Sequence, residues 1–371
     1  MATAAPHRVD VPVGRVAVGA YTIPTDHPES DGTLAWDSTT IVVVEVEGGR
    51  ETGLGYTYGD ASAAVLVRDT LADVVSGRDA MDIPAAWRAL AERVRNLGRP
   101  GIAATAISAL DLALWDLKAR LLEVPLATLL GRARESVPVY GSGGFTSYPV
   151  ERLREQLYGW VEEGISRVKM KVGRDPDGDV ERVRIAREAI GSEAALYVDA
   201  NGAYTCKQAL DLAGRFAELG VSWFEEPVSS DDLEGLRLVR DRAPAGMDVA
   251  AGEYGYDPSY FQRMLSAGAV DCLQADLTRC GGLTGFLAAA TIADAHMIDL
   301  SGHTAPAAHL AACCAVPRLR HLEWFHDHVR IERMLFDGFV EPVAGELHPD
   351  LAGPGLGLEL RRADAAGYAV S

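Results

Sequence analysis

Side chains able to transfer protons or to bind a metal recur through the second half of the chain. Each stands at or near the carboxyl end of a short apolar segment, and these segments recur roughly every 20 to 30 residues. Ammonium, carboxylate and imidazole groups of this kind carry out general acid–base catalysis beside a metal ion. The series comprises Lys169, Lys171, Asp199, Glu225, Glu253, Asp276, His303 and Glu323.

The KMK triplet places two lysines on one face of a strand. Residues two apart in a strand share a face, so Val168, Met170 and Val172 point one way and Lys169 and Lys171 point the other way. The apolar face suits contact with helices, which leaves the lysines facing inward. Because isolated ammonium groups in an apolar interior are costly, we expect carboxylates or an anionic ligand beside them.

Three carboxylates end three successive apolar segments, at Asp199, Glu225 and Glu253. Neighbouring strands lie about 4.8 Å apart, so the three groups can converge on one point. Their mutual repulsion requires a cation, and oxygen ligands without Cys or His favour Mg²⁺. The sequence therefore predicts a magnesium site. By strand alternation Glu226 points away from Glu225, and we expect it either to support the metal ligands from behind or to be a structural acid.

The spacing of the apolar segments predicts a parallel β/α barrel. Eight of them alternate with helical patterns after Gly131, as in barrels whose active sites lie at the carboxyl ends of the strands. The predicted strands span residues 137–143, 166–172, 195–201, 222–227, 248–253, 272–276, 297–303 and 319–325.

The first 130 residues predict a separate α+β unit. The β-branched run at 39–46 predicts a strand, and residues 53–60 predict its partner strand and a loop. The polar segment 21–36 contains Pro and Gly and predicts a loop. A run at 103–122 that is apolar on most sides predicts a buried helix, which carries Asp111 and Asp116.

The composition excludes several classes of protein. The 371 residues carry 35 Lys and Arg against 53 Asp and Glu, a net charge of −18, whereas non-specific binding to nucleic acid or anionic membranes needs a cationic surface. No apolar run reaches the length of about 18 residues that a membrane span needs, and the sequence start has no signal-peptide pattern. Five cysteines without metal-type spacing are expected to be reduced, mostly buried thiols in a cytoplasmic protein.

Several longer sequence motifs contain or flank the residues that could transfer protons or bind a metal. They are SALDLALWDLKA (108–119), KMK (169–171), YVDAN (197–201), WFEEP (223–227), AGE (251–253), DLTRCGG (276–282), SGH (301–303) and PGLGLEL (354–360). Together they resemble the enolase superfamily, and within it the mandelate racemase subgroup, over nearly the whole chain. We therefore expect an α/β protein with a modified (β/α)7β TIM-type barrel over residues 131–335. An α+β capping domain of residues 1–130 would be completed by the returning tail, residues 336–371.

The resemblance implies a role for each member of the series. Asp199, Glu225 and Glu253 would hold Mg²⁺. Lys171 would be the general base that removes a proton α to a carboxylate, while Lys169 helps to hold that carboxylate. The charge of Lys169 and of the metal would lower the pKa of Lys171, which must lose its proton to act as a base.

Three further roles follow from the resemblance. Asp276 and His303 would form a dyad in which His303 is an acid or base on the opposite face of the substrate. A protonated Glu323 would donate a hydrogen bond to the substrate carboxylate as it becomes an enediolate. Asn201 would contact a substrate hydroxyl group.

Other residues are candidates for contact with the substrate. Tyr140 and Ser142 lie on the first predicted barrel strand. The loops at 21–36 and 53–60 would close over the barrel mouth, as the resemblance implies, or they are ordinary surface loops. Their candidate contacts are Tyr21, His27, Tyr56 and Tyr58.

The resemblance implies α-proton abstraction from a small carboxylate, and the polar loops favour a sugar acid. We favour loss of the β-hydroxyl, which makes the protein a sugar-acid dehydratase giving a 2-keto-3-deoxy acid. Reprotonation on the other face, by a racemase or epimerase, is the alternative. A cycloisomerase or dipeptide epimerase is less favoured, because those relatives place a lysine at the position of Asp276.

Two hypotheses from other classes remain open. A class I aldolase would use Lys169 or Lys171 as a Schiff base without a metal, and a catalytically inactive scaffold would need none of this chemistry. The resemblance also implies a homo-oligomer. The pair Arg361–Arg362 has no functional explanation in the sequence.

Overall fold

The computed structural model describes residues 10–370, and eight parallel strands of this range close into a barrel. Each strand pairs with the next along the chain, and the last pairs with the first. The strands are β4 (Val137–Gly143), β5 (Arg167–Lys171), β6 (Ala195–Asp199), β7 (Val221–Glu225), β8 (Asp248–Ala251), β9 (Cys272–Ala275), β10 (Asp299–Gly302) and β11 (Leu319–Phe325). The TIM-type barrel expected from the sequence is confirmed. The predictions for residues 1–9 lie outside the described range.

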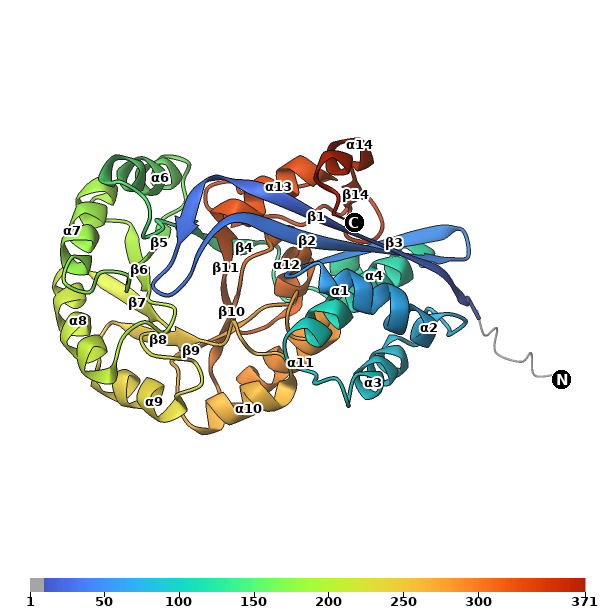
Figure 1. The fold of residues 1–371 in the computed structure, drawn as a ribbon, viewed down its shortest axis with the longest axis horizontal. Helices are drawn as coiled ribbons and strands as arrows, with labels where there is room; N and C mark the ends of the chain where they lie inside the picture. Colours follow the sequence, from blue (N-terminus) through green and yellow to red (C-terminus); the bar gives the residue numbers. More distant parts are fainter. Residues whose placement is uncertain (1–9, 371) are drawn as a thin grey trace.

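Helices connect the successive strands on the outside of the barrel (Figure 1). Local signals start several of them, such as the capping box of Thr205 and Gln208 before α8 and the Asp257 cap with Pro258 before α10. The helices are α6 (Val150–Glu162), α7 (Asp179–Ile190), α8 (Cys206–Glu218), α9 (Leu233–Arg242), α10 (Pro258–Ser266), α11 (Gly282–Ala295) and α12 (Pro306–Ala315), followed after β11 by α13 (His326–Leu335).

A three-stranded antiparallel sheet and several helices form the cap beside the barrel. Its long helix α4 (Ile102–Leu121) packs on the sheet and is buried over most of its surface, as its apolar sequence predicts. The other elements are β1 (Val13–Ser30), β2 (Ala35–Gly48), β3 (Glu51–Tyr58), α1 (Ser62–Leu66), η1 (Val67–Leu71), α2 (Ala72–Val75), α3 (Ile83–Arg93) and α5 (Leu126–Leu130).

Glycine in β3 allows the helix and the sheet of the cap to approach closely. A Cβ atom at Gly55 would lie 2.2 Å from the backbone oxygen of Ala109 in α4. We therefore expect Gly55→Ala to lower the free energy of unfolding by about 1–3 kcal/mol, the usual cost of overpacking, in a urea titration. The matched control is Gly159→Ala in α6, where a Cβ meets nothing within 4 Å. Equal losses in the two variants would contradict this account.

The segment 21–36 is not a loop, and that expectation was wrong. β1 and β2 form one long hairpin whose turn lies at residues 31–34, and the ladder continues through pairs such as Pro24–Ser38 and Glu29–Trp36. A register irregularity between Pro24 and Glu29 accommodates the polar stretch. Pro24 is tolerated because β1 is an edge strand. The segment lacks alternation of its own, so its strand conformation depends on pairing with β2.

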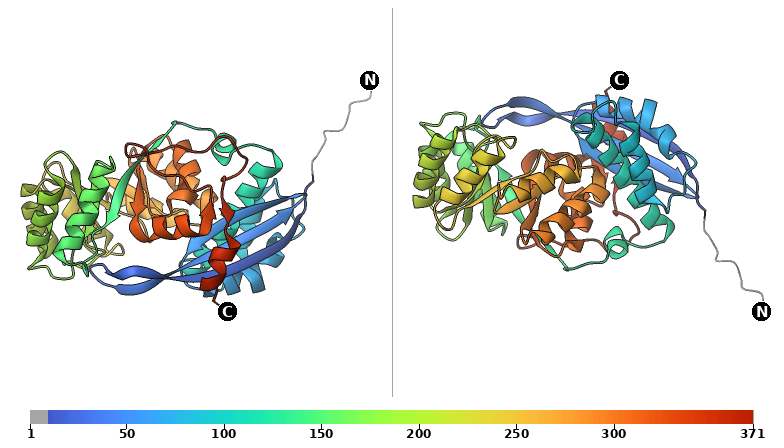
Figure 2. Two further views of the ribbon diagram at one scale, coloured as in Figure 1. Left: turned by 90° about the horizontal axis from the view of Figure 1, so that it is seen from above. Right: turned by 90° about the horizontal axis from the view of Figure 1, so that it is seen from below.

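The hairpin reaches from the cap across the barrel (Figures 1 and 2). Ser147 donates a hydrogen bond to the carbonyl oxygen of Pro28 at 2.7 Å. A Cβ atom at Gly32 would lie 2.5 Å from the carbonyl oxygen of Ala200, just beyond β6. The turn is therefore seated at the carboxyl ends of the barrel strands, where the chemical residues lie.

Glu29, in the hairpin, makes the stability of the folded protein depend on pH. Its side chain is buried, and Oε2 accepts a hydrogen bond from Trp36 at 2.8 Å. Burial, followed by the nearby charge of Asp327, raises its pKa from 4.5 to about 9. The folded protein therefore holds a proton that the unfolded chain releases, so stability falls as pH rises through this window, by about 1.4 kcal/mol per pH unit.

We therefore expect Glu29→Gln to become more stable relative to the wild type as the pH rises from 5 to 8. The amide preserves an acceptor for Trp36 and has no proton to lose. Unfolding titrations at the two pH values measure the difference, and the exposed Glu218→Gln serves as the control. A difference between wild type and Glu29→Gln that is independent of pH would contradict the assignment.

The C-terminal segment returns to the cap. Its elements are β12 (Phe336–Asp337), β13 (Glu346–Leu347), β14 (Glu359–Leu360), α14 (Arg362–Ala365) and η2 (Ala366–Tyr368). The backbone N–H of Val370 donates to the carbonyl oxygen of Ala20 in β1. Arg361 pairs with Asp337 within the C-terminal segment, whereas Arg362 pairs with Glu45 of β2 and so holds the segment to the cap.

Aromatic side chains fill the interior of the barrel below the catalytic and metal-binding candidates. Tyr140, Tyr197 and Trp223 pack together there with Ala250 and Cys272. The five cysteines are free thiols, of which Cys206 alone is only partly buried. Within residues 10–370, no helix combines the length and the apolar character needed to cross a bilayer.

Candidate active site

Lys169 and Lys171 point into the barrel mouth, as strand alternation predicts. The Nζ atom of Lys169 lies 2.5 Å from Glu225 Oε1 and 2.8 Å from Glu323 Oε1. The Nζ atom of Lys171 lies 2.5 Å from Asp199 Oδ2. Both ammonium groups are buried against carboxylates, which meets the requirement that their charge be balanced.

The three expected metal ligands come together. One oxygen from each of Asp199, Glu225 and Glu253 lies within 4.8 Å of the others, and all three side chains are buried. The strand register produces this arrangement, because Asp199 is directly beside Glu225 on the neighbouring strand. Burial, then the charge of Asp199, raises the pKa of Glu225 to about 8. A cluster of buried oxygen donors with excess negative charge fits a hard divalent cation such as Mg²⁺.

The pKa of Lys171 is raised above its ordinary value, whereas the sequence analysis expected it to be lowered. Burial and Lys169 oppose the charge, but attraction to Asp199 and other carboxylates outweighs them. The expectation assumed a bound dication, and these carboxylates are the groups that a dication would neutralise. The charge balance among Asp199, Glu253 and Glu225 therefore controls whether Lys171 can be a base.

Asp276 and His303 form the expected pair. His303 Nδ1 lies 2.8 Å from Asp276 Oδ2, and Thr278 donates to Asp276 Oδ1 from its backbone N–H and its hydroxyl. The second ring nitrogen, Nε2, lies 3.0 Å from Glu253 Oε2. Burial opposes protonation of His303, but Glu253 and Glu323 outweigh it and raise its pKa to about 10. The imidazolium is therefore the form present at neutral pH.

Glu323 is ionised, which corrects the expectation of a protonated acid. Burial would favour the neutral form, but Lys169 and His303 lower its pKa to about 2. Its Oε2 accepts a hydrogen bond from the backbone N–H of Thr304 at 3.1 Å. In this structure Glu323 is a counter-ion of Lys169 rather than a hydrogen-bond donor.

A cavity of about 350 Å³ lies above these groups. Of the residues predicted from sequence, it is lined by Lys171, Asn201, Glu253, His303 and Glu323. The side-chain oxygen of Asn201 is buried without a hydrogen-bond partner. That oxygen is free to accept a hydrogen bond from a substrate hydroxyl, which supports the role expected for Asn201.

Five predicted substrate contacts do not line this cavity. Tyr140 and Ser142 are wholly buried inside the barrel, and Tyr140 packs on Tyr197 and His321. Tyr21 pairs with Ile41 within the hairpin, and His27 is exposed beside Tyr148. Tyr56 is buried and donates to Glu332 Oε1 at 2.6 Å.

Tyr58, a candidate contact from the segment 53–60, lines the cavity and stacks on His328 with ring centroids 3.5 Å apart. The cavity wall also contains residues that were not predicted from the sequence. Arg279 belongs to the DLTRCGG motif, three residues after Asp276, and that position was the available signal. Further lining residues are Asp31, Leu34, Trp36, Ser38, Thr39, Thr40 and Tyr254.

Strand alternation does not extend to Glu226. Its backbone has a positive φ of 38°, so the chain leaves the strand at this residue. Burial, followed by the charges of Glu253 and Asp199, raises its pKa well above the ordinary value. Glu226 therefore lies within the electrostatic reach of the carboxylate cluster rather than apart from it.

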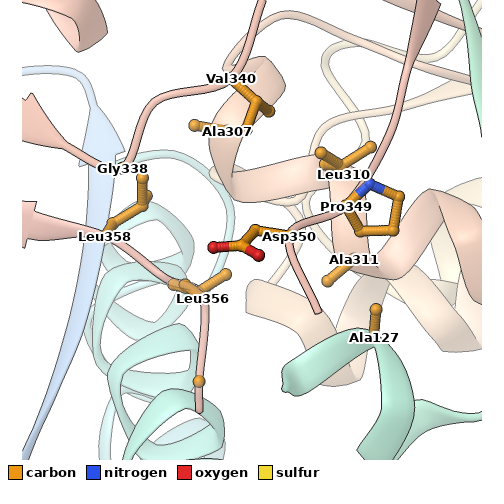
Figure 3. A pocket seen from close by; sticks show the side chains of 11 residues that line it. Ala127, Ala307, Leu310, Ala311, Gly338, Val340, Pro349, Asp350, Leu356 and Leu358 are labelled. Atoms are coloured by element: carbon orange, nitrogen blue, oxygen red, sulfur yellow. The ribbon is translucent and has the colours of Figure 1, made fainter. Parts of the chain in front are cut away.

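A second, much smaller cavity lies between α12, α5 and the C-terminal segment (Figure 3). Its volume of about 30 Å³ holds no more than a few water molecules. Ala307, Leu310 and Leu356 are typical of its apolar lining, and the carboxylate of Asp350 lies among them (Figure 3). None of the catalytic candidates lines it, so the chemistry belongs to the larger cavity.

Comparison with known proteins identifies two family domains. Residues 19–131 match the N-terminal domain of mandelate racemase and muconate lactonizing enzyme, and residues 152–365 match the enolase C-terminal domain-like family.

Curated relatives include a 3,6-anhydro-alpha-L-galactonate cycloisomerase from Streptomyces coelicolor, 33% identical over 94% of this chain and 98% of the relative. An L-talarate/galactarate dehydratase from Salmonella typhimurium is 32% identical over 77% of this chain and 73% of the relative. The curated relatives thus include both cycloisomerases and dehydratases.

Solved structures show the same fold. A mandelate racemase/muconate lactonizing enzyme-like protein from Rubrobacter xylanophilus is 59% identical, with a TM-score of 0.95 over 97% of this chain and 100% of that one. A racemase from Streptomyces coelicolor with bound magnesium is 32% identical, with a TM-score of 0.91 over 96% of this chain and 100% of that one. The chain therefore belongs to the mandelate racemase and muconate lactonizing enzyme family of the enolase superfamily.

Proposed function

We propose that the protein removes the proton α to the carboxylate of a sugar acid in a Mg²⁺-dependent reaction and then eliminates the oxygen on the β carbon. The observation that carries the proposal is the placement of Lys171 and His303. Both line one cavity. Lys171 extends from β5, beside the cluster strand β6, and His303 from the end of β10, which β9 separates from the cluster strand β8. With water as the leaving group, the product is a 2-keto-3-deoxy acid.

The metal would be held by Asp199, Glu225 and Glu253, and it would supply positive charge that stabilises the enediolate. Lys169 would help to hold the substrate carboxylate, as the family resemblance implies. Its fully buried ammonium group contacts Glu225 and Glu323, and Glu323 lines the cavity. Lys171, as the free amine, takes the α proton. Neutralisation of its carboxylate neighbours is what shifts Lys171 toward that form.

His303 is suited to act as the acid. Asp276 holds Nδ1 so that Nε2 faces the cluster, and the protonated ring can deliver a proton from Nε2. Removal of the α proton leaves its electron pair in the enediolate. As the carboxylate re-forms, that pair makes the C=C bond between the α and β carbons, the C–O bond at the β carbon breaks, and the oxygen leaves with the proton from His303. The resulting enol tautomerises to the ketone.

The leaving oxygen determines the name of the reaction. A free hydroxyl departs as water, which makes the enzyme a dehydratase. An oxygen that belongs to a ring stays attached, so the same elimination opens the ring without loss of atoms. The cycloisomerase and the dehydratase among the relatives support both outcomes. Proton return to the α carbon from His303 is the third outcome, racemisation or epimerisation.

Proton NMR of the protein with Mg²⁺ and a panel of sugar acids in D₂O distinguishes these outcomes. New signals at C3 of a 3-deoxy product identify elimination, and a product mass that shows no loss of water identifies ring opening. Deuterium at the α carbon with intact hydroxyls identifies racemisation or epimerisation. Activity that survives EDTA, together with a covalent substrate adduct that borohydride traps, would show Schiff-base chemistry and would contradict the proposal.

A further inference from the structure

We infer that the substrate carries one carboxylate only and that its far end is an uncharged polyol or ring. This inference rests on the proposed function. It comes from the distribution of charge around the cavity, in which the positive groups gather at the reacting end and the hairpin wall has none.

The positive side chains at the cavity are already paired with carboxylates of the protein. Among the described residues that line it, the lysine and arginine side chains are Lys171 and Arg279, and His303 lies with Nε2 3.0 Å from Glu253 Oε2. Lys171 and His303 face the carboxylate cluster. Arg279 lies with Nε 3.4 Å from Asp276 Oδ2 and with Nη1 3.3 Å from the carbonyl oxygen of Glu253. The guanidinium is thus a counter-ion of the dyad and of a metal-ligand candidate.

The wall formed by the hairpin carries no compensating cation. Within the described chain, its lining residues are Asp31, Leu34, Trp36, Ser38, Thr39 and Thr40. Asp31 holds the turn, because its Oδ1 accepts from the backbone N–H groups of Thr33 and Leu34. A second substrate carboxylate at this end would therefore approach another carboxyl group rather than a lysine or arginine.

The remaining wall is aromatic and uncharged. His328 stacks on Tyr58, with the two ring planes 10° apart. Its Nδ1 accepts from the backbone N–H of Ala305 at 3.4 Å, so the tautomer that fits this bond carries the proton on Nε2. Burial and the neighbouring positive groups lower its pKa to about 3, which makes the ring a neutral partner.

These surfaces match the far end of a sugar rather than a second acid group. The hydroxyls of Ser38, Thr39 and Thr40 can exchange hydrogen bonds with sugar hydroxyls, and the faces of Trp36 and Tyr58 suit the C–H faces of a sugar. A desolvated carboxylate without a cation is strongly disfavoured. Discrimination against the diacid should therefore be large.

Matched pairs of acids that differ only at the far carbon test the inference. We expect kcat/KM for D-galactonate or D-gluconate, whichever has the reactive stereochemistry, to exceed that for the matching D-galactarate or D-glucarate by at least 100-fold. Equal or faster turnover of a diacid would overturn the inference while leaving the proposed function intact.

Binding gives an independent measurement. In the Lys171→Ala variant with Mg²⁺, calorimetry should detect the monoacid and show at least tenfold weaker binding of its diacid. Tighter binding of the diacid would overturn the inference. Absence of α-proton exchange for every acid tried with the wild type, despite this binding preference, would instead overturn the proposed function.

A charge introduced at the hairpin turn provides a second test. Leu34 lines the cavity and is 63% exposed, so Leu34→Arg can be accommodated without repacking. We expect this variant to raise the diacid-to-monoacid ratio of kcat/KM by tenfold or more, whereas the uncharged Leu34→Gln should not raise it. If Leu34→Arg and Leu34→Gln gave the same ratio, the hairpin wall would not select against charge.

Discussion

Replacing Lys171 by alanine is expected to reduce α-proton exchange by roughly 10³-fold or more, within the range that a positioned general base contributes. The Nζ atom of Lys171 is the cavity-lining amine beside the carboxylate cluster. His303 reaches the cavity from another strand end and cannot replace it on the same face of the substrate. Exchange of the α proton in D₂O, followed by NMR, measures the effect.

The matched control for this variant is Lys207→Ala, which removes an exposed lysine from α8. Lys171→Ala should retain Mg²⁺ binding, because its ammonium group repels a cation and its loss leaves the three carboxylates in place. Exchange that continued at the wild-type rate in Lys171→Ala would show that another group is the base.

Replacing Glu225 by glutamine is expected to weaken Mg²⁺ binding by at least about 100-fold, since even groups that only support metal ligands cost 10- to 100-fold when removed. The amide has nearly the same shape but lacks the negative charge at the centre of the cluster. Titration calorimetry measures the affinity directly. A thermal scan supplies a second readout, because Mg²⁺ at 100 times its Kd stabilises the wild type by about 2.7 kcal/mol.

Glu234→Gln, an exposed substitution on α9, is the matched control for the metal experiment. It should bind Mg²⁺ as the wild type does. Should Glu225→Gln and the wild type bind with the same affinity, the cation would be held elsewhere and the assignment of the cluster would be wrong.

The barrel and the inward lysines could be predicted from sequence because both depend on local rules. Alternation within a strand decides that Lys169 and Lys171 face inward, and parallel strands bring Asp199, Glu225 and Glu253 to one end. Both rules need only the residues of the strand itself and the order of the strands. The structure agrees on each of these points.

The hairpin and the cavity wall could not be predicted, because they depend on contacts between distant segments. Residues 21–30 are extended only because β2 pairs with them. Tyr56 does not line the cavity, and its hydroxyl group donates a hydrogen bond to Glu332, which lies 276 positions later in the chain. No local sequence pattern in either segment predicts such a distant partner.

The charge states were missed for a related reason. Glu323 was expected to be protonated, but Lys169, from a different strand, lies 2.8 Å away and keeps it ionised. Alternation also failed at Glu226, where the backbone leaves the strand with φ 38°. Sequence identifies the titratable groups of such a site, whereas their protonation depends on cross-strand distances.

The most direct test of the central claim is the exchange of the α proton of a sugar acid with D₂O in the wild-type protein, measured with Mg²⁺ and then with EDTA. The account predicts that the NMR signal of the C2 proton disappears with Mg²⁺ and persists when EDTA is present. Exchange that is unaffected by EDTA, or no exchange in any sugar acid of the panel despite bound Mg²⁺, would contradict it.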